Sequence, residues 1–87
     1  MKIIYVDCDD PNYLDYFEPI QIINGRWRWA RVLNPNCFLG GGSFPSKFRL
    51  VLHYAKLIKY EMWDNTSIVK MSDTEYNKMK MIQELLK

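Results

Sequence analysis

The residues best suited to chemistry form a cluster of carboxylates near the start of the chain. Asp7, Asp9 and Asp10 follow an apolar run, residues 3–6, whose branched and aromatic side chains predict a strand. Carboxylate oxygens are the ligands that hard divalent cations prefer, so such a cluster can hold a metal ion. The simpler interpretation, an acidic segment in contact with water, is favoured. We therefore predict no metal and no cofactor.

A strand followed by Asp7, one intervening residue and Asp9 also resembles the opening motif of haloacid-dehalogenase-type phosphatases. That resemblance implies a nucleophilic carboxylate, an acid/base carboxylate and a bound Mg²⁺. The threonine expected two positions after the second aspartate is absent, because Pro11 and Asn12 follow Asp10. A chain of 87 residues is also too short for the doubly wound fold of that family. The sequence therefore argues against this activity.

The potential nucleophiles lack partners that the sequence supports. His53 is the only histidine, and pairing it with Cys8, Cys37 or Ser43 produces none of the local signatures of cysteine or serine hydrolases. Two cysteines and one histidine also fall short of a four-ligand zinc site. The glycine-rich stretch 40–43 lacks the Gly-Lys-Ser/Thr ending of a phosphate-binding loop. We predict that the protein is not an enzyme.

Charge is sorted along the chain. Residues 1–18 carry a net charge of −4, residues 19–60 carry seven basic and no acidic residues, and residues 61–87 carry a net charge of −1. Blocks of this kind produce surface fields that affect the choice of partner rather than the fold.

The acid-free stretch contains the motif Arg-Trp-Arg-Trp-Ala-Arg at residues 26–31, and basic residues alternating with aromatic ones are typical of proteins that bind single strands. Asn24-Gly25 predicts a two-residue hairpin turn. The resulting register places Ile20, Ile22, Trp27 and Trp29 on one face, and Gln21, Ile23, Arg26 and Arg28 on the other. The tryptophans are then expected in the core, with the arginines pointing outward together.

Two candidate binding surfaces follow. The predicted basic face consists of Arg26, Arg28, Arg31, Arg49 and Lys56. It either binds phosphate groups or is dispersed and neutralised by the acidic N-terminal segment, and the sequence favours neither alternative.

The second candidate surface is the acidic–aromatic segment, comprising Asp9, Asp10, Tyr13, Asp15 and Tyr16. Aromatic anchors among charges are common in interface hot spots, and the carboxylates suit a basic protein surface.

The predicted fold is a single α+β domain, residues 1–87. A small antiparallel sheet contains the N-terminal strand, the hairpin at Asn24-Gly25 and a short strand near 66–71, while residues 7–17 and 34–46 read as loops. A helix is expected near 46–60, although its pattern also alternates as a strand. Its predicted apolar stripe is Phe48, Val51, Leu52, Ala55, Ile58 and Met62. A capping box at Ser72 and Glu75 predicts a C-terminal helix over 73–86.

These observations favour a small binding protein, an inhibitor or adaptor that docks on a nucleic-acid-handling protein. The composition, rich in Lys, Asn and Ile, is compatible with a phage or mobile element, where anti-CRISPR proteins occur. The alternative is a direct nucleic-acid-binding module that uses the basic face of residues 26–59. The chain shows neither a signal-peptide pattern nor a membrane-length apolar stretch, so we expect a cytoplasmic protein with reduced cysteines and no membrane partner. Its oligomeric state is left open.

Overall fold

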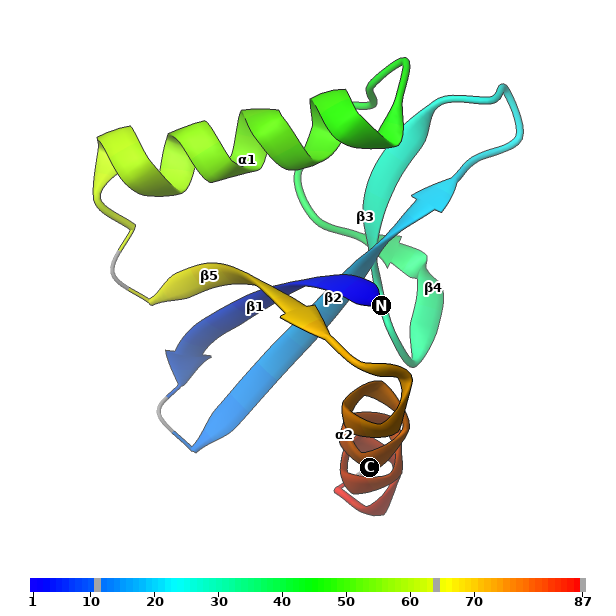
Figure 1. Cartoon of the computed structure of the whole chain (residues 1–87), viewed down its shortest axis with the longest axis vertical. Coiled ribbons are helices and arrows are strands. Elements are labelled where there is room, and N and C mark those ends of the chain that lie inside the picture. The colour runs from blue at the N-terminus through cyan, green and yellow to red at the C-terminus, as the bar shows by residue number, and fades with distance from the viewer. Residues whose placement is uncertain (11, 64, 87) are drawn as a thin grey trace.

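The computed structural model describes residues 1–10, 12–63 and 65–86, which form a five-stranded antiparallel sheet with one helix on each face (Figure 1). In chain order the elements are β1 (Lys2–Asp10), β2 (Tyr13–Gln21), β3 (Trp27–Arg31), β4 (Asn34–Phe38), α1 (Lys47–Glu61), β5 (Thr66–Met71) and α2 (Asp73–Leu85). The order across the sheet is β4-β3-β2-β1-β5. The predicted α+β class and both predicted helices are confirmed.

The sheet extends further than the sequence predicts. Of the predicted loop at residues 7–17, residues 7–10 instead continue β1 and residues 13–17 begin β2, while residue 11 lies outside the described residues. Asp7 lies opposite Asp15, and Asp10 lies opposite Tyr13. Part of the predicted loop 34–46 forms the edge strand β4, where proline is tolerated because an edge strand has an unpaired side. In both places, pairing with a neighbouring strand outweighs the local preference of Asp, Asn and Pro for turns.

The turn between β2 and β3 differs from the predicted two-residue turn. The Ile22 amide donates to the Arg26 carbonyl at 2.7 Å, and the Gly25 amide donates to the Ile22 carbonyl at 2.9 Å, which leaves residues 23–25 as the loop. Gly25 has a φ of 81°, whereas Asn24 is not among the residues with positive φ. A two-residue type I′ turn needs positive φ at both positions, so the sequence adopts the longer loop with glycine in the left-handed conformation.

This longer loop shifts the strand register. The observed pairs are Pro19 with Trp29, Ile20 with Arg28 and Gln21 with Trp27. Directly opposite residues share a face of the sheet, so the predicted face of two isoleucines and two tryptophans is wrong. The tryptophans share their face with Phe17, whereas Ile20 shares its face with Arg28. The core position expected for Trp29 is confirmed, because this side chain is 0% exposed.

The core is divided by the sheet into two clusters. On the α1 side, Tyr5, Phe17 and Trp29 pack against Leu50 and Tyr54. The Trp29 indole N–H has no acceptor among the described residues, so ring packing dominates its burial. On the α2 side, a second cluster comprises Ile4, Val32, Tyr76 and Met79. The neighbours Ile4 and Tyr5 serve different clusters because successive side chains of a strand point to opposite faces.

Helix α1 is rotated relative to the predicted apolar stripe. Its buried residues are Leu50 and Tyr54, with Ile58 one turn further along and packed against the same cluster. Phe48 is 73% exposed and Leu52 is 40% exposed, although both were expected in the core. Residues 50, 54 and 58 also have helical spacing, so they form a second possible apolar stripe. This stripe faces the sheet because it packs the Tyr54 ring against the aromatic cluster.

The capping box that begins α2 is confirmed. The Ser72 hydroxyl accepts the Glu75 amide at 3.2 Å, and the Glu75 carboxylate accepts the Ser72 amide at 3.4 Å. Met71 and Tyr76, at the two staple positions, belong to the same apolar cluster. The helix ends at Leu85, one residue before the predicted end.

The close approach of Gly40 to Tyr54 gives a first prediction. Gly40 has a φ of 70°, and a Cβ added there would lie 2.5 Å from the Tyr54 hydroxyl, whereas a Cβ at Gly41 meets nothing within 4 Å. Gly40→Ala should lower the free energy of unfolding by about 1–2 kcal/mol in urea titrations. Gly41→Ala is the matched control and should change it by less than about 0.5 kcal/mol. Equal effects of the two substitutions would contradict this packing.

Candidate functional site

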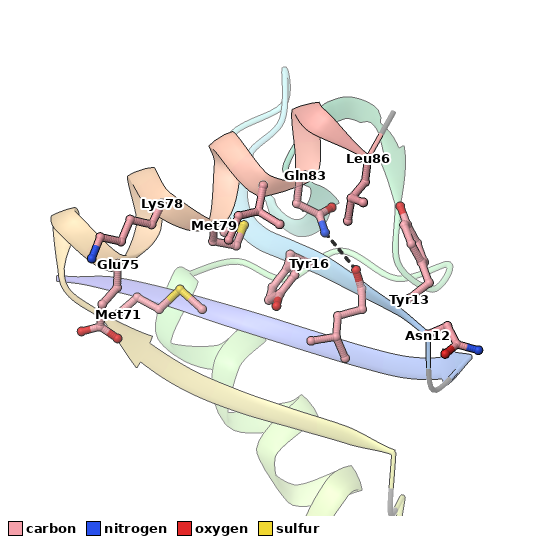
Figure 2. Close-up of a pocket in the computed structure, with 11 residues that line it drawn as sticks. Asn12, Tyr13, Tyr16, Met71, Glu75, Lys78, Met79, Gln83 and Leu86 are labelled. Carbon is pink, nitrogen blue, oxygen red and sulfur yellow. Dashed lines mark hydrogen bonds between the residues drawn. The ribbon is translucent and has the colours of Figure 1, made fainter.

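A groove of about 520 Å³ lies between α2 and the β1–β2 hairpin (Figure 2). Tyr16 and Met71 come from the sheet, and Met79 comes from the inward side of α2. At one end Gln83 crosses the groove, and its amide donates to the Leu14 carbonyl at 3.1 Å. This hydrogen bond fixes α2 over the end of β2, and the remaining lining is mainly apolar.

This groove between α2 and the β1–β2 hairpin is called the α2 groove. Its rim carries apolar side chains that are not part of the core clusters. Ile82 is 57% exposed and Leu86 is 65% exposed, and both line the groove. Tyr13, on the opposite wall, is 46% exposed. Large apolar side chains gathered at a groove, rather than scattered singly, are characteristic of interaction sites.

The structure divides the predicted acidic–aromatic segment between the two faces of the sheet. Asp10 lies directly opposite Tyr13, and its carboxylate accepts the Asn12 amide at 2.9 Å. Since Asn12 and Tyr13 both line the α2 groove, Asp10 stands at the mouth of this groove. Asp9 instead lines a smaller pocket on the other face together with Asp7. Of the five predicted residues, Asp10, Tyr13 and Tyr16 are therefore brought together.

Asp15, the remaining predicted acidic residue, is paired with Arg31. The guanidinium donates to both carboxylate oxygens, at 3.0 and 2.7 Å, in a bidentate arrangement. The hydrogen bonds to Asp15 raise the pKa of Arg31. For Arg31, the acidic N-terminal segment therefore neutralises the charge of the predicted basic face, which is one of the two alternatives that the sequence left open.

The predicted basic face is not one surface. Arg26 donates to the Ser43 hydroxyl at 2.7 Å and to the Ser43 carbonyl at 2.8 Å. Arg28 donates to the Gly40 carbonyl at 2.5 Å and stacks on the Phe38 ring at 4.2 Å. These two arginines fasten the glycine-rich loop to the hairpin.

The last two predicted basic residues, Arg49 and Lys56, line a separate groove of about 640 Å³ on the outer side of α1. The Phe44 and His53 rings contact each other there, with their centroids 4.9 Å apart and their planes inclined at 42°. Phe48 and Leu52 complete the apolar part of this groove. Sequence reasoning missed these two residues because it assigned them to the core. The alternative stripe at residues 50, 54 and 58 was the signal that could have found them.

The carboxylate cluster has an unusual environment. Asp7 is partly buried, and its Oδ1 atom has no hydrogen-bond partner within the described part of the chain. Burial raises the pKa of Asp7, and the negative charges of Asp9 and Asp15 raise it further. Among the residues that the structure describes, no group of three His, Cys, Asp or Glu side chains is placed to hold a metal ion.

Comparison with known proteins finds no family model, no curated protein and no solved structure that matches this chain. Within residues 1–10, 12–63 and 65–86, neither helix has the length and apolar character needed to cross a bilayer. The two grooves are therefore interpreted from their own geometry.

The raised pKa of Asp7 gives a second prediction. Stability contributed by its protonated form is present below the unfolded-state pKa of about 3.9 and is lost as the pH rises through the higher folded-state pKa. Asp7→Asn stays neutral, so it should raise the melting temperature at about pH 7 and give little gain at about pH 3. Thermal denaturation followed by circular dichroism measures both values.

Asp9→Asn is the control for this experiment, because it removes a neighbouring charge but leaves the Asp7 carboxylate in place. It should give a smaller gain than Asp7→Asn at neutral pH. A gain from Asp7→Asn that is the same at both pH values would show that the charge of Asp7 is not responsible.

Proposed function

We propose that this protein is a small non-catalytic binding protein, an inhibitor or adaptor that docks on a nucleic-acid-handling protein. The observation that carries the proposal is the α2 groove, where an apolar floor meets exposed Tyr13, Ile82 and Leu86. Anchors of this kind supply most of the binding energy in protein interfaces, whereas chemistry requires polar groups that converge on a reacting atom.

The shape of the groove suits an amphipathic helix or ridge of the partner. One wall is a helix and the other is a strand end, so an apolar side chain can enter between them (Figure 2). Recognition of an apolar helix face in a groove depends on a few anchors at helical spacing. Ile82 on α2 and Leu86, the residue that caps this helix, are four residues apart and both exposed, so they present such a spacing.

The charge beside the groove favours a basic partner. Asp10 stands at its mouth and Glu75 lies towards its other end, with Lys78 nearby (Figure 2). Surfaces that bind nucleic acid are basic, so an acidic hairpin beside apolar anchors complements them. A counter-defence protein of the anti-CRISPR kind, docked on the nucleic-acid surface of its target, would meet this description.

Affinity capture gives the third prediction. Immobilised protein should retain a discrete, basic, nucleic-acid-binding partner from a lysate of its source cells, and Ile82→Asp should weaken that partner's affinity by about tenfold or more in a binding titration. Ile82 is more than half exposed, so the aspartate should leave the fold intact, which circular dichroism checks.

The matched control is Leu52→Asp, an exposed apolar position on α1 that lies outside the α2 groove. It should retain the partner at the wild-type level. Two results contradict the proposal: retention of the partner by Ile82→Asp at full strength, or loss of the partner only with Leu52→Asp.

A further inference from the structure

We propose that the groove on the outer side of α1 is a second binding site, and that its ligand is single-stranded nucleic acid. This site is separate from the α2 groove, and the inference does not rest on the protein-docking function. In place of the basic face of five cations, this site has two cations, Arg49 and Lys56, and the rings of Phe44, Phe48 and His53.

The cations of the predicted basic face differ in whether they are already hydrogen-bonded within the fold. Arg26, Arg28 and Arg31 are already bound to acceptors of the chain. Arg49 and Lys56 are exposed, and within the described ranges neither of them takes part in an ion pair. They therefore have charge available for a phosphate backbone.

The helix that carries Arg49 and Lys56 has almost no opposing charge, because its only acidic side chain is Glu61, the last residue of α1. The first turn of α1 contains no acidic residue, and the sequence contains none from Pro19 to Tyr60. Lys47 and Lys59 extend the same positive charge towards the two ends of the helix. A strand that follows the helix axis would meet cations along most of its length.

Aromatic rings lie beside these cations in the same groove. Phe48 is 73% exposed beside Arg49, and the core does not require it. The Phe44 and His53 rings lie in the same groove with their centroids 4.9 Å apart and their planes inclined at 42°. Exposed rings between cations match the way in which single strands are bound, because bases stack on aromatic faces while cations contact phosphates. A duplex keeps its base faces stacked inside and cannot use these rings.

An oligonucleotide titration gives the fourth prediction. Fluorescence anisotropy with labelled oligo-dT and oligo-rU of about 12 nucleotides should show binding at low salt that weakens as salt is added. Phe48→Ala should weaken binding by about tenfold through lost stacking. Lys56→Ala should also weaken it and reduce the slope of log affinity against log salt by about one.

Two controls separate this site from the rest of the molecule. Ile82→Asp in the α2 groove should leave oligonucleotide affinity unchanged, and circular dichroism should show that Phe48→Ala remains folded. A difference between oligo-dT and oligo-rU would assign the strand as DNA or RNA, and supports the proposal in either case. Ile82→Asp tests only the α2 groove. Failure of the protein-docking proposal therefore leaves the single-strand-binding proposal testable, and the reverse also holds.

Three results overturn the inference. The first is an absence of binding to both oligomers at low salt. The second is unchanged affinity in Phe48→Ala, which would mean that the rings do not contact bases. The third is tighter binding of a glutamate-rich peptide of equal charge, which would assign the groove to an acidic protein segment.

Discussion

The position of α1 depends on the packing of one ring, that of Tyr54. Its centroid lies 5.7 Å from that of Tyr5 and 6.1 Å from that of Trp29, both in edge-to-face geometry. Its hydroxyl donates to the Leu39 carbonyl at 3.3 Å, so the polar end of the buried ring has an acceptor. Because this ring points into the sheet, the opposite side of the helix, with Phe48 and Leu52, must face solvent.

The same constraint explains the polar contacts of the hairpin. Leu39 and Gly40 have to approach Tyr54 closely, and Arg28 holds this loop by donating to the Gly40 carbonyl. Arg26 makes a comparable contact with Ser43, which is next to Phe44 in the groove on the outer side of α1. Arginines that the charge pattern suggests for a partner therefore act within the fold, and they shape the groove that remains available.

The two helices lie on opposite faces of the sheet (Figure 1). Each of them lines one of the two grooves and leaves part of its apolar surface exposed. Helix α2 is held by Tyr76 and Met79 in the core, by the Tyr76 hydroxyl on Glu18 at 2.6 Å and by Gln83 on β2. Burial and this hydrogen bond to Glu18 raise the pKa of Tyr76. This arrangement allows one surface to contact a partner protein while the other is free for a different ligand.

The sequence by itself determined the elements whose signals are local. The Ser72–Glu75 capping box specified α2, and the strand at 66–71 and the helix near 46–60 were predicted nearly to the residue. The sequence could not determine which side of α1 faces the sheet. The stripe that contains Phe48 and Leu52 and the stripe that contains Leu50 and Tyr54 both have the spacing of an apolar helix face. The register after Asn24-Gly25 was also undetermined, since one extra loop residue reverses the face of every paired side chain. Those choices were made by tertiary packing around Trp29 and Tyr54, and they decide which cations and rings are left for binding.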